Sequence, residues 1–160
     1  MYTVQGLVAD LLLKKGQMLA TAESCTGGMI AAACTDLAGS SAWFERGFVT
    51  YSNEAKTHML GVDAALIKQH GAVSEEVVRA MVQGAIAHSR AQVAVAVTGV
   101  AGPTGGSAAK PVGTVWFGFA TPAGVVTEMQ HFAGDRAAVR TATVHHAFQR
   151  LVTLLAAQSG

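Results

Sequence analysis

Apolar residues recur at helical spacing near both ends of the chain. The first set lies on one helix face, with Gly16 as a stop signal behind it, and comprises Val4, Leu7, Val8, Leu11 and Leu12. The second set forms a broad apolar face behind the sequence Gly134-Asp135-Arg136 and comprises Val144, Ala147, Phe148, Leu151, Val152 and Leu155. The pattern predicts one helix near the start of the chain and another at its end.

Between these two helices, short apolar runs alternate with segments of helical character. The runs rich in β-branched and aromatic residues have the length of strands and cover residues 18–24, 44–52, 92–99, 113–120 and 124–133. The helical segments cover residues 25–39, 53–61, 63–71 and 74–89. Asn53 is expected to cap the helix over 53–61, and Ser74 the helix over 74–89, where Glu75 and Glu76 suit the first turn.

The last two strands are separated only by Thr121-Pro122-Ala123, a connection that suits an antiparallel hairpin. Because the other strands alternate with helices, we expect a mixed, mainly parallel sheet covered by helices. No linker or internal repeat divides the chain, and 160 residues are the size of one ordinary domain. The sequence therefore predicts a single three-layer α/β/α domain over residues 1–160, with the hairpin in its sheet.

Composition excludes several classes of protein. The chain is 51% hydrophobic and 13% charged, which argues against disorder. A formal charge of +1 without a Lys/Arg cluster gives no electrostatic support for a nucleic-acid surface. The apolar runs are shorter than the roughly 20 residues of a membrane helix, and the first run ends in Lys14-Lys15-Gly16 instead of a cleavage site. We expect a cytoplasmic protein in which Cys25 and Cys34 stay reduced.

The longest irregular segment, residues 99–113, joins two predicted strands and is rich in glycine. Gly99, Gly102, Gly105 and Gly106 would let backbone N–H groups approach an anion. The alternative is a flexible crossover without a ligand. Neither a phosphate-loop motif nor a dinucleotide-binding glycine fingerprint occurs, so an NTPase or a nicotinamide-dependent dehydrogenase has no direct support.

A second candidate for ligand binding is the segment where the strand over 18–24 leads into a helix. Glu23, Ser24, Thr26 and Gly27 lie there, and anions and nucleotides often bind at such a junction. Helix capping alone would explain the same residues. If a nucleotide binds, we expect Glu23 to accept a hydrogen bond from a sugar hydroxyl, because a carboxylate repels phosphate.

Ser41, Tyr51 and Lys56 frame a short segment with a different chemical pattern. A serine is a weak nucleophile until a neighbouring group removes its proton, and a neutral lysine can do so. If a helix begins at Asn53, Lys56 lies in its first turn, where an ammonium is unfavourable. Tyr51 would then orient or relay the proton. The ordinary alternative is a turn serine, a packing tyrosine and a solubilising lysine, and the adjacent Ser40 is a rival nucleophile.

The six histidines do not form a metal-binding pattern. There is no H-E-x-x-H motif, and the adjacent His145 and His146 point about 100° apart on a helix. There is also no G-x-S-x-G motif to nominate the serine of a Ser-His-Asp triad. We therefore expect no metal cofactor.

Several separated motifs together carry a family resemblance. "TAESCTGG", "GSSAWFERGFVTYSNEAK", "GAVS", "TGVAGPTGGSAAKPVGTVW" and "GDR" occur in this order between Thr21 and Arg136. They resemble the CinA C-terminal domain family, and in particular its stand-alone bacterial nicotinamide-nucleotide amidases. The resemblance implies hydrolysis of the carboxamide of nicotinamide mononucleotide, giving nicotinic acid mononucleotide and ammonia in pyridine-nucleotide salvage. It also implies a homodimer that uses no metal or redox cofactor and whose partner is the small nucleotide, not nucleic acid or a membrane.

The resemblance implies roles for individual residues as well. The serine before the W-F pair, and the tyrosine and lysine of Y-S-N-x-x-K, are associated with catalysis in the family, which points to Ser41, Tyr51 and Lys56. Ser41 would attack the amide carbon, and Lys56 would accept its proton. Thr98 and the backbone of residues 99–106 would stabilise the oxyanion or hold the substrate. Arg136, with Arg140 as the alternative, would pair with the 5′-phosphate.

Two other classes of function fit the same residues. A nucleotide-binding regulatory module would bind the nucleotide without turnover. An interaction domain, in which the serine and lysine are structural, would not be stabilised by the nucleotide at all.

Overall fold

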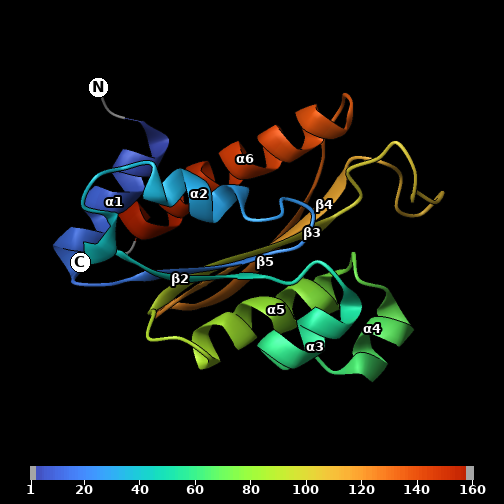
Figure 1. The fold of residues 1–160 in the computed structure, drawn as a ribbon, viewed down its shortest axis with the longest axis horizontal. Coiled ribbons are helices and arrows are strands. Elements are labelled where there is room, and N and C mark those ends of the chain that lie inside the picture. The colour runs from blue at the N-terminus through green and yellow to red at the C-terminus, as the bar shows by residue number, and fades with distance from the viewer. Residues whose placement is uncertain (1–2, 158–160) are drawn as a thin grey trace.

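The computed structural model describes residues 3–157 and contains one five-stranded sheet between two layers of helices (Figure 1). Along the chain the elements are α1 (Val4–Lys15), β1 (Leu19–Glu23), α2 (Met29–Thr35), the 3-10 helix η1 (Ser40–Ala42), β2 (Phe44–Val49), α3 (Asn53–Leu60), α4 (Ala64–His70), α5 (Glu75–Ala87), β3 (Val93–Gly99), β4 (Thr114–Thr121), β5 (Gly124–His131) and α6 (Arg136–Ala157).

The strands lie in the order β2-β1-β3-β4-β5. β1 pairs in parallel with both β2 and β3, whereas β4 pairs antiparallel with β3 and with β5. The predicted mixed sheet with an antiparallel hairpin is confirmed. Because β2, β1 and β3 run in the same direction, the residues that follow these three strands meet at one edge of the sheet.

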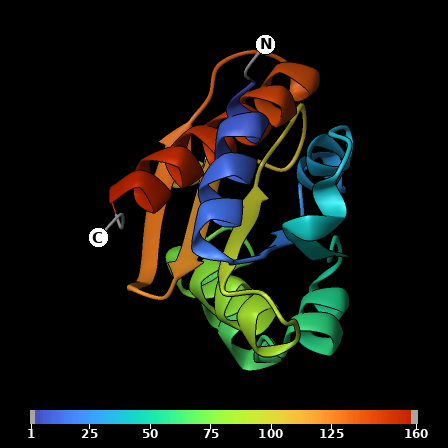
Figure 2. The ribbon, with the colours of Figure 1, turned by 90° about the vertical axis from the view of Figure 1, so that its left-hand side faces the viewer.

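Helices α1, α2 and α6 cover one face of the sheet, and α3, α4 and α5 cover the other (Figures 1 and 2). Each face has its own hydrophobic core. β3 contributes to both cores, since Val95 and Val97 face the first and Ala94 and Ala96 the second, as the alternation of side chains along a strand requires. The predicted three-layer α/β/α architecture is confirmed.

Most predicted helix ends agree with the structure. The Thr3 hydroxyl accepts a hydrogen bond from Gly6 N–H at the start of α1, and Gly16 ends that helix with φ 63°. Two details were wrong. The cap of α3 is Ser52 and not Asn53, because Ser52 Oγ accepts from Ala55 N–H at 3.0 Å. The helix expected over 25–39 is shorter, because Gly28 has a left-handed backbone and α2 begins only after it.

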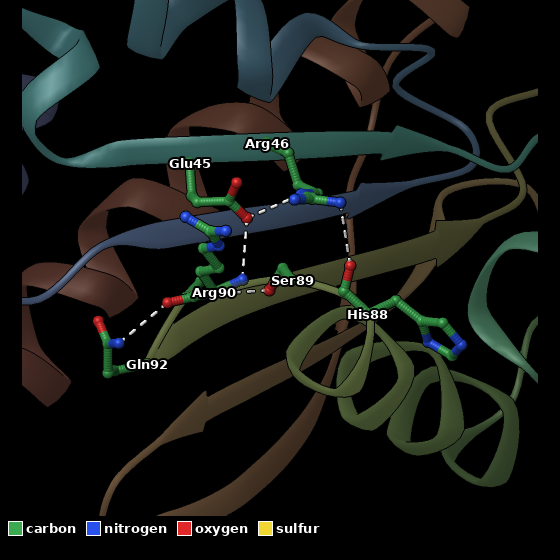
Figure 3. Close-up of polar contacts among 7 residues, drawn as sticks. Glu45, Arg46, His88, Ser89, Arg90 and Gln92 are labelled. Atoms are coloured by element: carbon green, nitrogen blue, oxygen red, sulfur yellow. Dashed lines mark hydrogen bonds and ion pairs between the residues drawn. The ribbon is translucent and has the colours of Figure 1, made fainter.

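A polar cluster closes the opposite end of the sheet (Figure 3). The Glu45 carboxylate accepts hydrogen bonds from Arg46 Nε at 2.7 Å and from Arg90 N–H at 3.0 Å. Arg46 Nη1 also donates to the His88 carbonyl at 3.2 Å. These contacts tie the start of β2 to the connection between α5 and β3, so the cluster has a structural role.

Across residues 3–157, none of the helices combines the length and the apolar character needed to cross a membrane.

Candidate active site

The side-chain amine of Lys56 lies in a polar pocket of the protein interior. Lys56 is only 1% exposed, and its Nζ lies 3.0 Å from Ser24 Oγ, 3.0 Å from the Thr50 carbonyl and 3.2 Å from the Tyr51 carbonyl. Burial lowers the pKa of Lys56 below its ordinary value of 10.5. A neutral amine has two N–H donors and one lone pair. It can donate to both carbonyls and still accept the proton of the Ser24 hydroxyl.

Parallel strand pairing brings Ser24 and Lys56 together. Ser24 directly follows β1, and its N–H donates to the Val97 carbonyl of β3 at 3.1 Å. On the other side of β1, Thr50 N–H donates to the Glu23 carbonyl at 2.8 Å. The Thr50 carbonyl in turn accepts from Lys56. The ladder at the carboxyl end of the sheet therefore fixes both members of the pair.

A cavity of about 250 Å³ opens beside this pair. It lies at the ends of the three parallel strands, which is the usual ligand position in an open α/β sheet. Its lining residues are Ser24, Cys25, Tyr51, Asn53, Lys56, Ala72, Val73, Thr98, Gly99, Ala101 and Arg136. The cavity thus contains the serine and lysine, an arginine and several backbone segments, which is a suitable set for acyl transfer on an anionic substrate.

Ser41 does not approach Lys56 within the chain. It lies in η1, before β2, whereas Lys56 lies in α3, after β2. The six residues of β2 put roughly 20 Å between the two ends of the strand at about 3.3 Å per residue. Ser40 shares η1 and is separated from Lys56 in the same way. Tyr51, in contrast, lines the cavity and is 63% exposed.

Glu23 lies behind the cavity and not in its wall. Its carboxylate is 1% exposed and accepts hydrogen bonds from Thr26 Oγ1 at 2.5 Å, Ile30 N–H at 2.8 Å and Ala31 N–H at 3.0 Å. The carboxylate therefore occupies the donors at the start of α2, where a sugar hydroxyl or a phosphate was expected. Thr26 is fully buried and Gly27 lies outside the cavity lining.

Only part of the glycine-rich segment reaches the cavity. Gly99 lines it together with Thr98, whose hydroxyl donates to the Ala72 carbonyl at 2.9 Å. Gly102 lies nearby, and its carbonyl accepts from Arg136 Nη1 at 2.9 Å. Gly105 and Gly106 are exposed and do not line the cavity. The loop that contains them extends beyond the sheet (Figure 1).

The two candidate arginines have different surroundings. Arg136 lines the cavity and holds the Gly102 carbonyl. Arg140, one turn further along α6, donates from Nε to the Cys25 carbonyl at 3.1 Å and from Nη2 to the Thr26 carbonyl at 3.3 Å. Arg136 therefore has the better position to reach a ligand in the cavity, and Arg140 supports the turn after β1.

The two thiols are poor nucleophiles. Burial raises the pKa of Cys25 to about 11 and that of Cys34 to about 12, so neither forms a thiolate near neutral pH. Within the described part of the chain, no three His, Cys, Asp or Glu side chains gather in a group that would hold a metal ion.

Sequence reasoning included Ser24 among the binding residues but missed its contact with Lys56. It also missed the cavity residues Asn53, Ala72 and Val73. The sequence did contain a signal for this contact. One predicted strand ends at Ser24, and another leads into the helix that carries Lys56. Only the strand order shows that these two ends are neighbours.

Comparison with known proteins identifies the family of the chain. The model of the CinA C-terminal domain matches residues 1–155. The chain belongs to the CinA C-terminal domain family. This CinA domain is 57% identical over 145 residues to the nicotinamide-nucleotide amidohydrolase PncC of Escherichia coli strain K12, with 90% of this chain and 88% of that protein covered. It is 55% identical over 152 residues to PncC of Pseudomonas putida, with 95% of each covered.

Solved structures give the same fold for the CinA domain. The crystal structure of the competence damage-inducible protein A from Klebsiella pneumoniae superimposes with a TM-score of 0.94 at 41% identity, covering 98% of this chain and 97% of that one. A CinA-superfamily protein from Escherichia coli superimposes with a TM-score of 0.90 at 37% identity, covering 95% and 90%.

Proposed function

We propose that this chain hydrolyses the carboxamide of nicotinamide mononucleotide, giving nicotinic acid mononucleotide and ammonia in pyridine-nucleotide salvage. The observation that carries the proposal is the 3.0 Å contact between Lys56 Nζ and Ser24 Oγ at the wall of a cavity. The identity of 55% or more to relatives named nicotinamide-nucleotide amidohydrolase, over most of both chains, supports the choice of substrate.

In the proposed mechanism Ser24 is the nucleophile and Lys56 the general base. Neutral Lys56 removes the Ser24 proton while Ser24 Oγ attacks the amide carbon. The resulting Lys56 ammonium returns the proton to the departing nitrogen, and ammonia leaves. Water then attacks the acyl ester while Lys56 accepts its proton. The bond between the acyl carbon and Ser24 Oγ breaks, Lys56 returns the proton to Ser24 Oγ, and nicotinic acid mononucleotide leaves. Ser24 takes the role expected of Ser41 because it is the hydroxyl that Lys56 contacts within the chain.

Tyr51 and Arg136 are assigned to the substrate. Tyr51 lines the cavity, and its role is to orient the carboxamide or relay a proton. Arg136 pairs with the 5′-phosphate. A guanidinium has five N–H donors, so Arg136 can hold the Gly102 carbonyl and still bind phosphate. Thr98 and the backbone of Gly99 complete the wall that holds the substrate.

The test is ammonia release from nicotinamide mononucleotide by the parent chain, Ser24→Ala and Ser41→Ala, without added metal. We expect Ser24→Ala to lower kcat by about a thousandfold or more and Ser41→Ala to stay within about threefold of the parent. The reverse result would return the nucleophile to Ser41, which would then have to come from another copy of the chain.

The parent chain alone separates the three classes of function. Turnover supports the amidase. Stabilisation by the nucleotide in a thermal melt, without ammonia release, would identify a nucleotide-binding regulatory module. If the nucleotide is neither hydrolysed nor stabilises the chain, the interaction domain is the remaining class of function.

The setting of the reaction is part of the proposal. We propose that the chain acts in the cytoplasm as a homodimer, with the small nucleotide as its partner and without nucleic acid, membrane or cofactor. Light scattering of the purified chain measures the oligomeric state directly.

A further inference from the structure

Arg140 holds two consecutive carbonyls immediately after Ser24. Its Nε donates to the Cys25 carbonyl at 3.1 Å, and its Nη2 donates to the Thr26 carbonyl at 3.3 Å. A Cβ placed on Gly27 would lie 3.6 Å from the same Nη2. The guanidinium of Arg140 on α6 therefore contacts the turn that leads from β1 to α2, more than 110 residues away in the sequence.

These contacts fix the orientation of the peptide groups in the turn. In a trans peptide the C=O and N–H bonds point in opposite directions. The Cys25 carbonyl points at Arg140, so the Thr26 N–H points away from it. Gly27 N–H donates to the Ser24 carbonyl at 3.1 Å, which closes the turn. Arg140 also holds the Thr26 carbonyl, and the peptide of this carbonyl carries the Gly27 N–H. The Ser24 carbonyl that accepts from Gly27 belongs to the peptide that carries the Cys25 N–H, so the Cys25 N–H points away from Gly27. Arg140 therefore orients the Cys25 N–H through Gly27.

Within residues 3–157, the Cys25 N–H contacts the sulfur of its own side chain, which is a weak acceptor, and neither the Cys25 nor the Thr26 N–H donates to another residue. Cys25 lines the cavity next to Ser24. In strand-turn-helix hydrolase sites, the N–H of the residue after the nucleophile stabilises the oxyanion. The Cys25 N–H has that position relative to Ser24.

We propose that Arg140 is a positioning residue that holds the turn over Ser24–Gly27 so that the Cys25 N–H faces the oxyanion. The inference rests on the proposed function, with Ser24 as the nucleophile. When the Ser24 oxygen bonds to the amide carbon, the π electrons of the carbonyl move to its oxygen and the serine proton passes to Lys56. The new negative charge then meets the Cys25 N–H, whose direction Arg140 has set in advance through the hydrogen bond from Gly27 N–H to the Ser24 carbonyl.

The proposal separates Arg140 from Arg136. A residue that only orients an oxyanion donor affects the transition state and leaves substrate binding almost unchanged, whereas a phosphate-binding residue affects the substrate complex. Lysine keeps the positive charge of an arginine but loses its planar two-donor fork. Arg140→Lys and Arg136→Lys are therefore a matched pair on the same helix.

The experiment measures kcat and KM for nicotinamide mononucleotide, and the inhibition constant of the analogue that has an aldehyde in place of the carboxamide. A serine adds to this aldehyde and forms a hemiacetal that mimics the tetrahedral intermediate. For Arg140→Lys we expect kcat to fall tenfold or more and the aldehyde to bind more weakly by a similar factor, with KM within about threefold. For Arg136→Lys we expect mainly a higher KM.

A merely structural Arg140 would give a different result. Loss of folded enzyme lowers the apparent kcat but leaves the inhibition constant of the aldehyde unchanged, and that outcome would overturn the proposal. A raised KM with unchanged kcat would overturn it too, by assigning Arg140 to the phosphate. If Arg140→Lys does not fold, Arg140→Ala with added guanidinium ion tests the same point, because restored turnover requires a guanidinium at this place.

Failure of the proposed function itself is recognised separately. A parent chain that releases no ammonia would remove the amidase, and an aldehyde that binds Ser24→Ala as tightly as it binds the parent would remove Ser24 as the nucleophile. Neither outcome depends on Arg140.

Discussion

Lys56 is 1% exposed, although lysine is among the residue types that are least often buried. Its burial is tolerated because Nζ has three polar neighbours within hydrogen-bond distance. These are the carbonyls of Thr50 and Tyr51 and the hydroxyl of Ser24. Burial disfavours the charged ammonium form of Lys56, which suits a side chain that acts as a base. Perturbed pKa values of this kind are common at active sites.

The pH dependence of stability tests this state of Lys56. In the folded chain the pKa is lowered, whereas the unfolded chain has the ordinary value of 10.5. Between these two values the unfolded chain binds a proton that the folded chain does not, so raising the pH stabilises the fold, by at most about 1.4 kcal/mol per pH unit. Below the folded-state pKa both forms are protonated and the effect is absent.

The comparison uses Lys56→Met, which cannot titrate at this position. We expect the free energy of unfolding of the parent, relative to this variant, to rise as the pH goes from 7 toward 10. Denaturant titrations at four pH values measure it. A difference that stays flat would mean that Lys56 has the same pKa in both states.

At the scale of elements, the position of Lys56 depends on how closely α3 packs against α5. Gly84 of α5 faces the last residue of α3, and a Cβ at Gly84 would collide with the Leu60 carbonyl. A glycine inside a helix normally costs stability. Here the absence of a side chain is what allows the two helices to touch.

Alanine substitutions at two helical glycines should therefore change the stability of the fold in opposite directions. Gly84→Ala should destabilise the fold by about 1–3 kcal/mol, because α3 must move away. It should also lower kcat, because α3 carries Lys56. Gly6→Ala in α1, where a Cβ meets only Thr3 Oγ1 at 3.4 Å, should stabilise the fold by about 0.5–1 kcal/mol. Thermal and denaturant unfolding measure both changes, and stabilisation by Gly84→Ala would show that the contact is not restrictive.

At the scale of the whole molecule, one sheet separates two hydrophobic cores. Phe148 of α6 is buried in the core on one face, and Met81 of α5 in the core on the other. The strands between them contribute side chains to both cores, so neither layer of helices has a sheet of its own. We expect the two faces to unfold together.

Large-to-small substitutions in each core test this cooperativity. Phe148→Ala should cost about 3–5 kcal/mol and Met81→Ala about 2–5 kcal/mol, each shifting a single transition. Met129→Ala on β5, where the methionine is 49% exposed, is the control and should change stability by about 0.5 kcal/mol or less. Two resolved transitions in either core variant, by circular dichroism and calorimetry, would show that the layers unfold independently.

Local patterns in the sequence predicted most elements because local forces produce them. The apolar faces of α1 and α6, the stop at Gly16, the cap at Ser74 and the β4–β5 hairpin each depend on residues a few positions apart. Where two neighbouring residues give the same local signal, the predicted helix cap was wrong by one residue. Ser52 and Asn53 can both cap a helix, and the structure uses Ser52.

The site shows the limit of such patterns. Ser41, Tyr51 and Lys56 are close in sequence, yet β2 carries the chain away from Ser41 before Lys56 is reached. Ser24 is more than 30 residues from Lys56 and lies in contact with it. The sequence alone determined the helices, the strands and the side chains that are available for catalysis, since these depend on local propensity and residue chemistry. The tertiary structure decided which serine meets the lysine, because that choice depends on the parallel pairing of β1 and β2, a contact between distant segments that no local pattern encodes.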